Sequence, residues 1–292
     1  MLAGPRTPGA VAELARLDGV LAGLDGLAER LADETGPRAY LLGLDPAGDG
    51  RAIVAVGNPD RSDNVLTYVP GMTSDLAGVG GELGRAERLA ARCAELGPAE
   101  QTATVLWLDY DAPDFLDEAL LATRADDAGP ALHRFQEGLR ATHDGTPARQ
   151  TVLGHSYGSL VVGATARDHG LAADGVAFVG SPGVGVDHAA ELGLPPGRVW
   201  SSTARDDVIQ YAALAPGEAL RRVAVSVALP GIGAPLAFGQ PADRLWFGAN
   251  PSAPEFGARA FPGSAAGHAG YWDAGNPALD GMARIALTGA AG

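Results

Sequence analysis

The chain contains no lysine and a single cysteine. All 21 basic residues are arginines, and with 35 acidic residues they give a formal net charge of −14. The lack of lysine excludes Schiff-base chemistry and a lysine general base. One cysteine excludes an intrachain disulfide and a multi-cysteine zinc site. Cys93 lies in a segment with helical spacing, residues 82–96, and we expect it to be a small core residue.

Runs of positive charge and long apolar stretches are also missing. A chain this acidic, without a basic patch, lacks the electrostatic footprint of a nucleic-acid or anionic-membrane binder. No apolar stretch is long enough to span a bilayer, and residues 1–36 lack the basic and apolar regions of a signal peptide. We therefore expect no nucleic-acid partner, no integral membrane association and a cytoplasmic location.

Apolar residues make up 46% of the 292 residues, enough for a substantial core. Continuous apolar runs, as in buried parallel strands, alternate with helical segments, which predicts an α/β fold with a mostly parallel sheet covered on both faces. The predicted strands are 65–69, 104–108, 151–153, 175–180 and 199–203, with a hairpin of 39–44 and 52–56 before them. The predicted helices are 80–96, 115–121, 131–139 and 277–287, and residues 123–130 form a polar segment.

The first 36 residues carry leucines at three- and four-residue spacing, from Leu14 to Leu31. This pattern predicts an amphipathic helix, or two helices because Gly19, Gly23 and Gly26 weaken it. We expect it to pack across the outside of the main domain. A coiled-coil partner is less favoured, because the stripe is short and interrupted by glycine.

The predicted domains are therefore an N-terminal helical extension, 1–36, and a main domain, 37–292. The Gly- and Pro-rich region around 210–245 is interpreted as an insertion or lid. Phe238, Trp246 and Phe247 would supply an apolar wall there.

Gly154-His155-Ser156-Tyr157-Gly158 lies between an apolar run and a small-residue helical segment. This Gly-x-Ser-x-Gly pattern is the nucleophile elbow, which lifts a serine clear of the sheet. The backbone N–H of Tyr157, at the start of the helix, is then an oxyanion donor. The alternative is a glycine-rich turn in which the serine only caps a helix.

A second oxyanion donor is expected in residues 70–74, after the strand 65–69. Gly71 allows close approach of the backbone, so the N–H of Met72 is the first choice and that of Thr73 the second. The alternative is an ordinary Pro-Gly turn.

A nucleophilic serine needs a base, and the base needs an orienting carboxylate, in the chain order Ser, acid, His. His268, in a loop of small residues, is the candidate base, and His188 is its rival. Asp207 is favoured over Asp206 as the acid because Val208 and Ile209 follow it, which suits an inward-facing carboxylate. The alternative for both is a solvated acidic turn.

Together these segments resemble the α/β-hydrolase superfamily, and more narrowly an actinobacterial branch of it classed as a domain of unknown function. The resemblance spans roughly residues 40–290 and includes the runs 57–60 through 68–71 and 246–251 through 256–259. It implies an eight-stranded sheet and a Ser-Asp-His triad at Ser156, Asp207 and His268. Val208 stands where the resemblance leads us to expect proline.

The sequence thus predicts a metal-independent serine hydrolase, without a cofactor, acting on an ester or related acyl bond of an uncharged small molecule. Acyl transfer or peptide hydrolysis on the same residues remains open, and so does a binding module that keeps the fold without turnover. A further alternative is a partner-binding protein organised by the N-terminal helix. Oligomeric state is not predicted.

Overall fold

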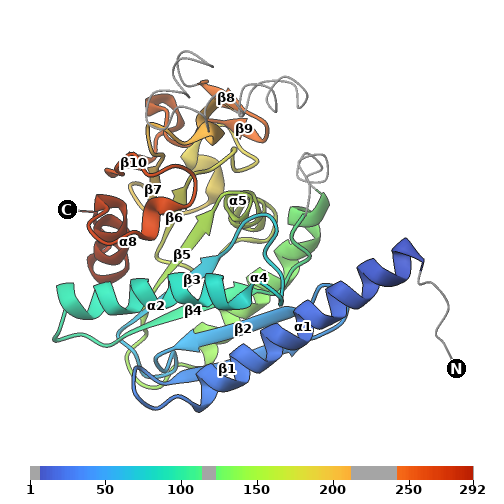
Figure 1. Cartoon of the computed structure of the whole chain (residues 1–292). Helices are drawn as coiled ribbons and strands as arrows, with labels where there is room; N and C mark the ends of the chain where they lie inside the picture. The colour runs from blue at the N-terminus through green and yellow to red at the C-terminus, as the bar shows by residue number, and fades with distance from the viewer. Residues whose placement is uncertain (1–6, 114–122, 212–241, 292) are drawn as a thin grey trace, which may run out of the picture.

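The structure is a computed structural model that describes residues 7–113, 123–211 and 242–291 (Figure 1). Eight strands form one sheet in the order β1-β2-β4-β3-β5-β6-β7-β10. Their bounds are β1 Ala39–Asp45, β2 Arg51–Val56, β3 Asn64–Val69, β4 Thr102–Leu108, β5 Arg149–His155, β6 Gly175–Val179, β7 Val199–Ser202 and β10 Arg259–Ala260. A separate two-stranded ribbon joins β8, Arg244–Leu245, to β9, Gly248–Ala249. The predicted α/β class is confirmed.

Six neighbouring strands of the sheet are parallel to one another, in the order β4, β3, β5, β6, β7 and β10. Strand β2 runs antiparallel to both β1 and β4. The predicted hairpin is therefore the β1–β2 pair. Because parallel strands end at one edge of a sheet, the loops after β3, β5, β7 and β10 open on the same side. That edge is where the sequence places every candidate site residue.

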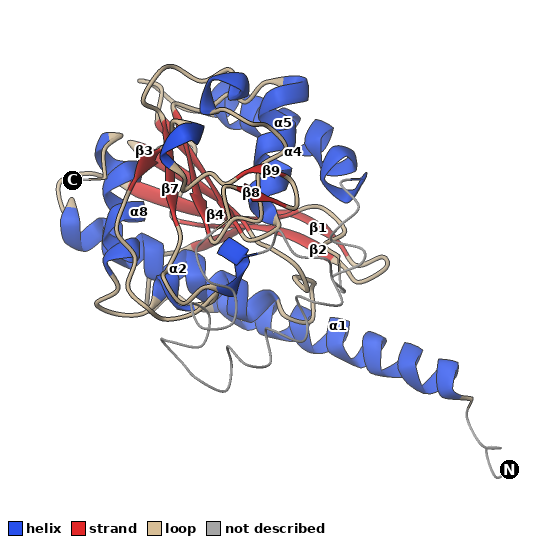
Figure 2. Ribbon diagram, turned by 90° about the horizontal axis from the view of Figure 1, so that it is seen from above, coloured by secondary structure: helices blue, strands red, loops and turns tan. Residues whose placement is uncertain are grey.

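Helices cover both faces of the sheet (Figure 2). On one face, α2, Val79–Leu96, packs against α8, Pro277–Thr288; on the other, α4, Thr123–Thr142, packs against α5, Gly158–His169. The strands between these layers are buried on both sides, which explains their continuous apolar sequences. Trp107, Phe178 and Trp200 are among the largest fully buried side chains.

The prediction that the polar segment 123–130 separates two helices is wrong, because α4 begins at Thr123 and continues through Pro130. Ala125, Ala128 and Leu132 are buried in this stretch. Apolar packing against α5 outweighs the local preference against a helix that contains proline. The helix predicted at 115–121, and most of the predicted lid with Phe238, lie outside the described residues.

The N-terminal segment forms one continuous helix, α1, Pro8–Ala32, rather than two. Val20, Gly23 and Leu27 are buried in its second half. A Cβ on Gly23 would lie 1.8 Å from the backbone oxygen of Leu76, so this close contact requires glycine. The first half of α1 extends beyond the body of the protein (Figures 1 and 2). Within the described ranges, no helix is both long and apolar enough to cross a bilayer.

Candidate active site

Ser156 occupies a tight turn between β5 and α5, as the motif predicts. Its φ of 53° is in the left-handed region, where only one other described non-glycine residue, Thr73, is found. A Cβ on Gly154 would lie 2.6 Å from the Cα of Ser159, and a Cβ on Gly158 would lie 2.3 Å from the Val69 oxygen. The two glycines therefore let strand, helix and neighbouring loop approach closely around a strained serine.

His268 lies next to Ser156, although 112 residues separate them in the sequence. Its Nε2 is 2.8 Å from the Ser156 Oγ, and its Nδ1 is 2.9 Å from Oδ2 of Asp207. Asp207 is fully buried. The structure thus brings the three predicted residues into one hydrogen-bonded chain. The rival base, His188, is exposed, and its Nδ1 lies 3.3 Å from the Glu255 carbonyl oxygen.

The Asp207 carboxylate accepts hydrogen bonds from two groups besides His268. The Tyr271 hydroxyl donates to Oδ2 at 2.5 Å, and the Ile209 N–H donates to Oδ1 at 2.9 Å. Burial alone would raise the pKa of Asp207, but the charge of His268 and these hydrogen bonds outweigh burial and lower it. Asp207 therefore stays ionised. Sequence reasoning missed Tyr271, whose only signal is its position three residues after His268.

His268 experiences opposing influences. Burial would lower its pKa, but the adjacent Asp207 carboxylate, through its charge and its hydrogen bond, raises the pKa above the ordinary value. About 35% of the side chain remains exposed to solvent. A base with this pKa is neutral only at pH values above it, so activity that depends on His268 as a base would be lost as the pH falls.

Two further residues hold the His268 loop, and neither role was predicted. The rival acid, Asp206, accepts the Gly267 N–H at 3.0 Å through Oδ2. The His155 Nε2 donates to the His268 carbonyl oxygen at 2.9 Å, and the two rings lie 4.9 Å apart. Burial, together with the charge of His268, lowers the pKa of His155 well below its ordinary value. His155 is therefore a neutral donor that fixes the backbone of the neighbouring histidine.

The loop after β3 presses against the serine. A Cβ on Gly71 would lie 2.6 Å from the Ser156 Cβ. Of the two predicted donors in this loop, the Thr73 N–H is already engaged, because it donates to the Pro113 carbonyl at 3.0 Å. The Tyr110 hydroxyl donates to the carbonyl oxygen of Pro70 at 2.7 Å and lies 3.3 Å from that of Gly71. Tyr110 thus orients the peptide groups next to Met72.

Aromatic rings line up beside the elbow. The ring of Tyr110 stacks on Trp107 at 6.1 Å and on Tyr157 at 6.4 Å. Phe247, part of the predicted apolar wall, meets the Tyr157 ring edge-on at 6.0 Å. Burial raises the pKa of Tyr157 to about 12, so this wall is uncharged at neutral pH.

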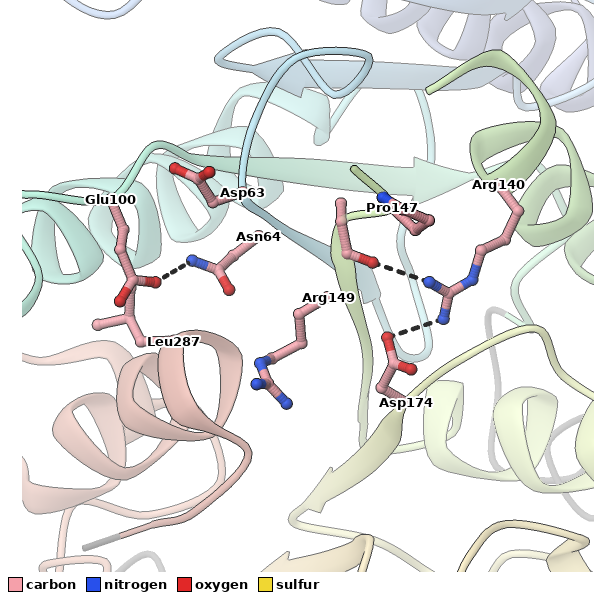
Figure 3. A pocket seen from close by; sticks show the side chains of 9 residues that line it. Asp63, Asn64, Glu100, Arg140, Pro147, Arg149, Asp174 and Leu287 are labelled. Carbon is pink, nitrogen blue, oxygen red and sulfur yellow. Dashed lines mark hydrogen bonds and ion pairs between the residues drawn. The ribbon is translucent and has the colours of Figure 1, made fainter. Parts of the chain in front are cut away.

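The described part of the chain contains no group of three His, Cys, Asp or Glu side chains arranged to hold a metal ion. A separate polar hollow of about 450 Å³ lies at the other edge of the sheet, where β3 and β5 begin (Figure 3). There Asn64 donates to Glu100, and Arg140 donates to Asp174 (Figure 3). These four side chains are hydrogen-bonded in pairs and lie a full strand length from Ser156. The hollow is therefore not part of the candidate site.

Comparison with known proteins places these features in a family. A sequence profile described as "Alpha/beta hydrolase" matches residues 45–216. An uncharacterised protein of Mycobacterium tuberculosis is 35% identical over 190 residues, which cover 62% of this chain and 70% of that protein. A second uncharacterised protein of the same species is 36% identical over 178 residues, 58% of this chain and 27% of that protein.

Similar solved structures include an arylesterase, 12% identical with a TM-score of 0.49, covering 94% of this chain and 90% of that one. An esterase from the archaeon Pyrobaculum calidifontis is 15% identical with a TM-score of 0.45, covering 94% and 92%. At these identities and scores, the likeness says nothing about the reaction.

Proposed function

The chain belongs to the alpha/beta hydrolase family, and from that premise we propose that it is a serine hydrolase cleaving an ester or related acyl bond. The observation that supports this most directly is the hydrogen-bonded chain from Ser156 through His268 to Asp207. A serine oxygen within 2.8 Å of an imidazole nitrogen, with that imidazole oriented by a buried carboxylate, is the arrangement that activates a hydroxyl as a nucleophile.

In the proposed reaction, the Oγ of Ser156 attacks the acyl carbon while the Nε2 of His268 takes the hydroxyl proton. Asp207 stabilises the imidazolium and keeps its Nδ1 protonated. His268 then gives its proton to the departing alcohol oxygen as the ester bond breaks, which leaves an acyl group on Ser156. A water molecule, deprotonated by His268, attacks this acyl-enzyme. The carboxylic acid leaves, and the proton returns to Ser156.

The oxyanion of each tetrahedral intermediate is assigned to the N–H groups of Met72 and Tyr157. Tyr157 directly follows the nucleophile at the start of α5, where the helix dipole favours negative charge. For Met72, the support comes from Tyr110. In a trans peptide the C=O and the N–H point in opposite directions, so the Gly71 carbonyl, which faces the Tyr110 hydroxyl at 3.3 Å, leaves the Met72 N–H pointing away from Tyr110.

Replacing Tyr110 with phenylalanine is therefore expected to lower kcat by about tenfold while changing KM little, because a misoriented donor weakens only transition-state binding. The measurement is steady-state hydrolysis of a p-nitrophenyl ester. Affinity for a trifluoromethyl ketone, which forms a tetrahedral adduct with the serine, should fall in parallel with kcat. Tyr40→Phe, on the edge strand β1, is a control of the same chemistry. An unchanged kcat in Tyr110→Phe would exclude this role for Tyr110.

The buried aromatic pair of Tyr157 and Phe247 beside the nucleophile favours an uncharged, partly apolar acyl group, since bringing a charge against these rings would cost hydration. We therefore propose small neutral esters as the substrate class. Turnover of only charged esters in a panel matched for acyl length would contradict this assignment.

A fluorophosphonate probe tests the proposed function directly, because it reacts only with an activated serine. We expect stoichiometric labelling of the wild type and little labelling of His268→Ala, in which the base is missing. His188→Ala is the matched control and should label like the wild type. If a well-folded wild-type protein neither reacts with the probe nor hydrolyses any neutral ester, the proposal is wrong.

A further inference from the structure

Helix α1 carries a regular apolar stripe that the described residues of the protein only half cover. Its members alternate at four- and three-residue spacing, the a/d pattern of a coiled coil. We call it the α1 seam: Ala10, Leu14, Leu17, Leu21, Leu24, Ala28 and Leu31. Leu24 and Leu31 are partly buried against the core. Leu14, Leu17 and Leu21 are 38%, 42% and 59% exposed.

The exposed part of the seam lies on a helix that is already folded and packed against the body of the protein. Val20 and Leu27, on the neighbouring face, fix the second half of α1 to the body. The first half extends outward from that anchor (Figures 1 and 2). Thr7 caps its N-terminus by accepting the Ala10 N–H at 3.3 Å. Because the helix needs no partner to form, a second helix could bind it without the cost of ordering this one.

The charges beside the seam determine which partner fits. In this pattern Leu17 and Leu24 occupy d positions, and the residues that follow them, Asp18 and Asp25, are acidic. Neither aspartate takes part in an ion pair within the described ranges. On the other flank, Glu13 pairs with Arg16 at 2.7 Å. Arg16 also donates to the Gly48 carbonyl of the body, so this arginine is not available to a partner. The open flank is therefore acidic.

A second copy of this chain fits such a flank poorly. An antiparallel pair of α1 helices would bring Asp18 and Asp25 of both copies together, and a parallel pair would place Asp18 of one copy beside Glu13 of the other, between proteins that each carry a net charge of −14. We propose instead that the α1 seam docks an amphipathic helix of another protein, with leucine-type residues on its own seam and arginine or lysine beside them. This inference goes beyond the proposed hydrolase function and does not depend on it.

The test uses the full chain and two synthetic peptides of about four heptads, both with leucine at every a and d position. One peptide has lysine at its e and g positions, and the other has glutamate. Fluorescence anisotropy should show binding of the basic peptide that weakens as salt is raised. Binding of the acidic peptide should be at least about tenfold weaker.

Variants of α1 separate the seam from the rest of the helix. Leu17→Gln and Leu21→Gln should each weaken binding of the basic peptide by about tenfold. Ala12→Gln, exposed but outside the seam, is the matched control and should leave binding unchanged. The double variant Asp18→Arg, Asp25→Arg should reverse the preference toward the acidic peptide. All four proteins should keep the helical signal in circular dichroism.

Several results would overturn the proposal. Equal affinity for the two peptides, or no binding of the basic peptide, would remove the charge argument. A stable dimer in sedimentation equilibrium that dissociates in Leu17→Gln would make a second copy the occupant. Binding of the basic peptide that is insensitive to Leu17→Gln and Leu21→Gln would place the contact elsewhere on the acidic surface.

Discussion

Ser156→Ala is expected to lower kcat for a neutral ester by about 10⁶-fold, because it removes the atom that forms the acyl-enzyme. KM should change little, since the walls of the site remain. Labelling by a fluorophosphonate should vanish. The fold should persist: alanine and serine are similarly strained at a φ of 53°, and the lost contact is one hydrogen bond to His268, worth about 1 kcal/mol.

The matched control is Ser202→Ala, another buried serine at the same edge of the sheet. Its hydroxyl has no hydrogen-bond partner among the described residues, so its loss should leave kcat within about twofold of the wild type. If Ser156→Ala retained a tenth of the wild-type kcat in a preparation free of contaminating esterase, a nucleophilic role for Ser156 would be excluded.

Asp207→Asn is expected to lower kcat by about 10⁴-fold with little change in the fold. The asparagine oxygen can still accept from the Ile209 N–H at the Oδ1 position, and the Tyr271 hydroxyl, which faces the Oδ2 position, can turn to accept from the amide nitrogen. Its amide nitrogen, however, would donate to the Nδ1 of His268, and the imidazole would then carry its proton on Nε2. In that tautomer the ring cannot accept the proton of Ser156.

The pH profile gives Asp207→Asn a second, independent readout. The pKa of His268 is raised, and Asp207 is the group that raises it. In the wild type, activity should therefore fall with decreasing pH through a midpoint above the ordinary histidine value. Without the carboxylate charge this pKa drops, so the residual activity of the variant should have its acid limb at lower pH. A midpoint that stays in place would contradict the electrostatic role.

Asp206→Asn is the matched control for that experiment. Asp206 accepts the Gly267 N–H, and an asparagine oxygen can do the same. We expect kcat within about threefold of the wild type and an unshifted acid limb, since this side chain does not touch the imidazole of His268. Equal losses in both variants would leave the choice between the two aspartates unsupported.

The sheet could be predicted because its parallel strands are buried on both faces, and such strands have continuous apolar sequences. The elbow could be predicted because a strained serine between close-packed elements needs glycine on both sides. Chain order and loop composition singled out Asp207 and His268. The start of α4 could not be predicted, because its polar sequence forms a helix only where Ala125 and Ala128 bury against α5.

The residues that support the site escaped sequence analysis for a different reason. Tyr110 bonds to Pro70 because β4 lies directly beside β3, although 40 residues separate them in the chain. His155 reaches the His268 carbonyl across 113 residues. Strand order brings these groups together, and strand order leaves no local trace in the sequence. Tyr271 lies only three residues from His268, so a local sequence pattern could have identified it as a supporting residue.

Because Cys93 is buried, its reaction with an alkylating reagent can be used to measure local unfolding of the protein. The thiol lies 3.9 Å from the Ala283 carbonyl oxygen, between α2 and α8, and burial raises its pKa to about 12. A thiol that is neither ionised nor accessible does not react with alkylating reagents. Since the chain has no other cysteine, any alkylation marks a molecule in which α2 and α8 have separated. The rate of that reaction in native buffer therefore reports how often this helical layer opens, without a label having to be introduced.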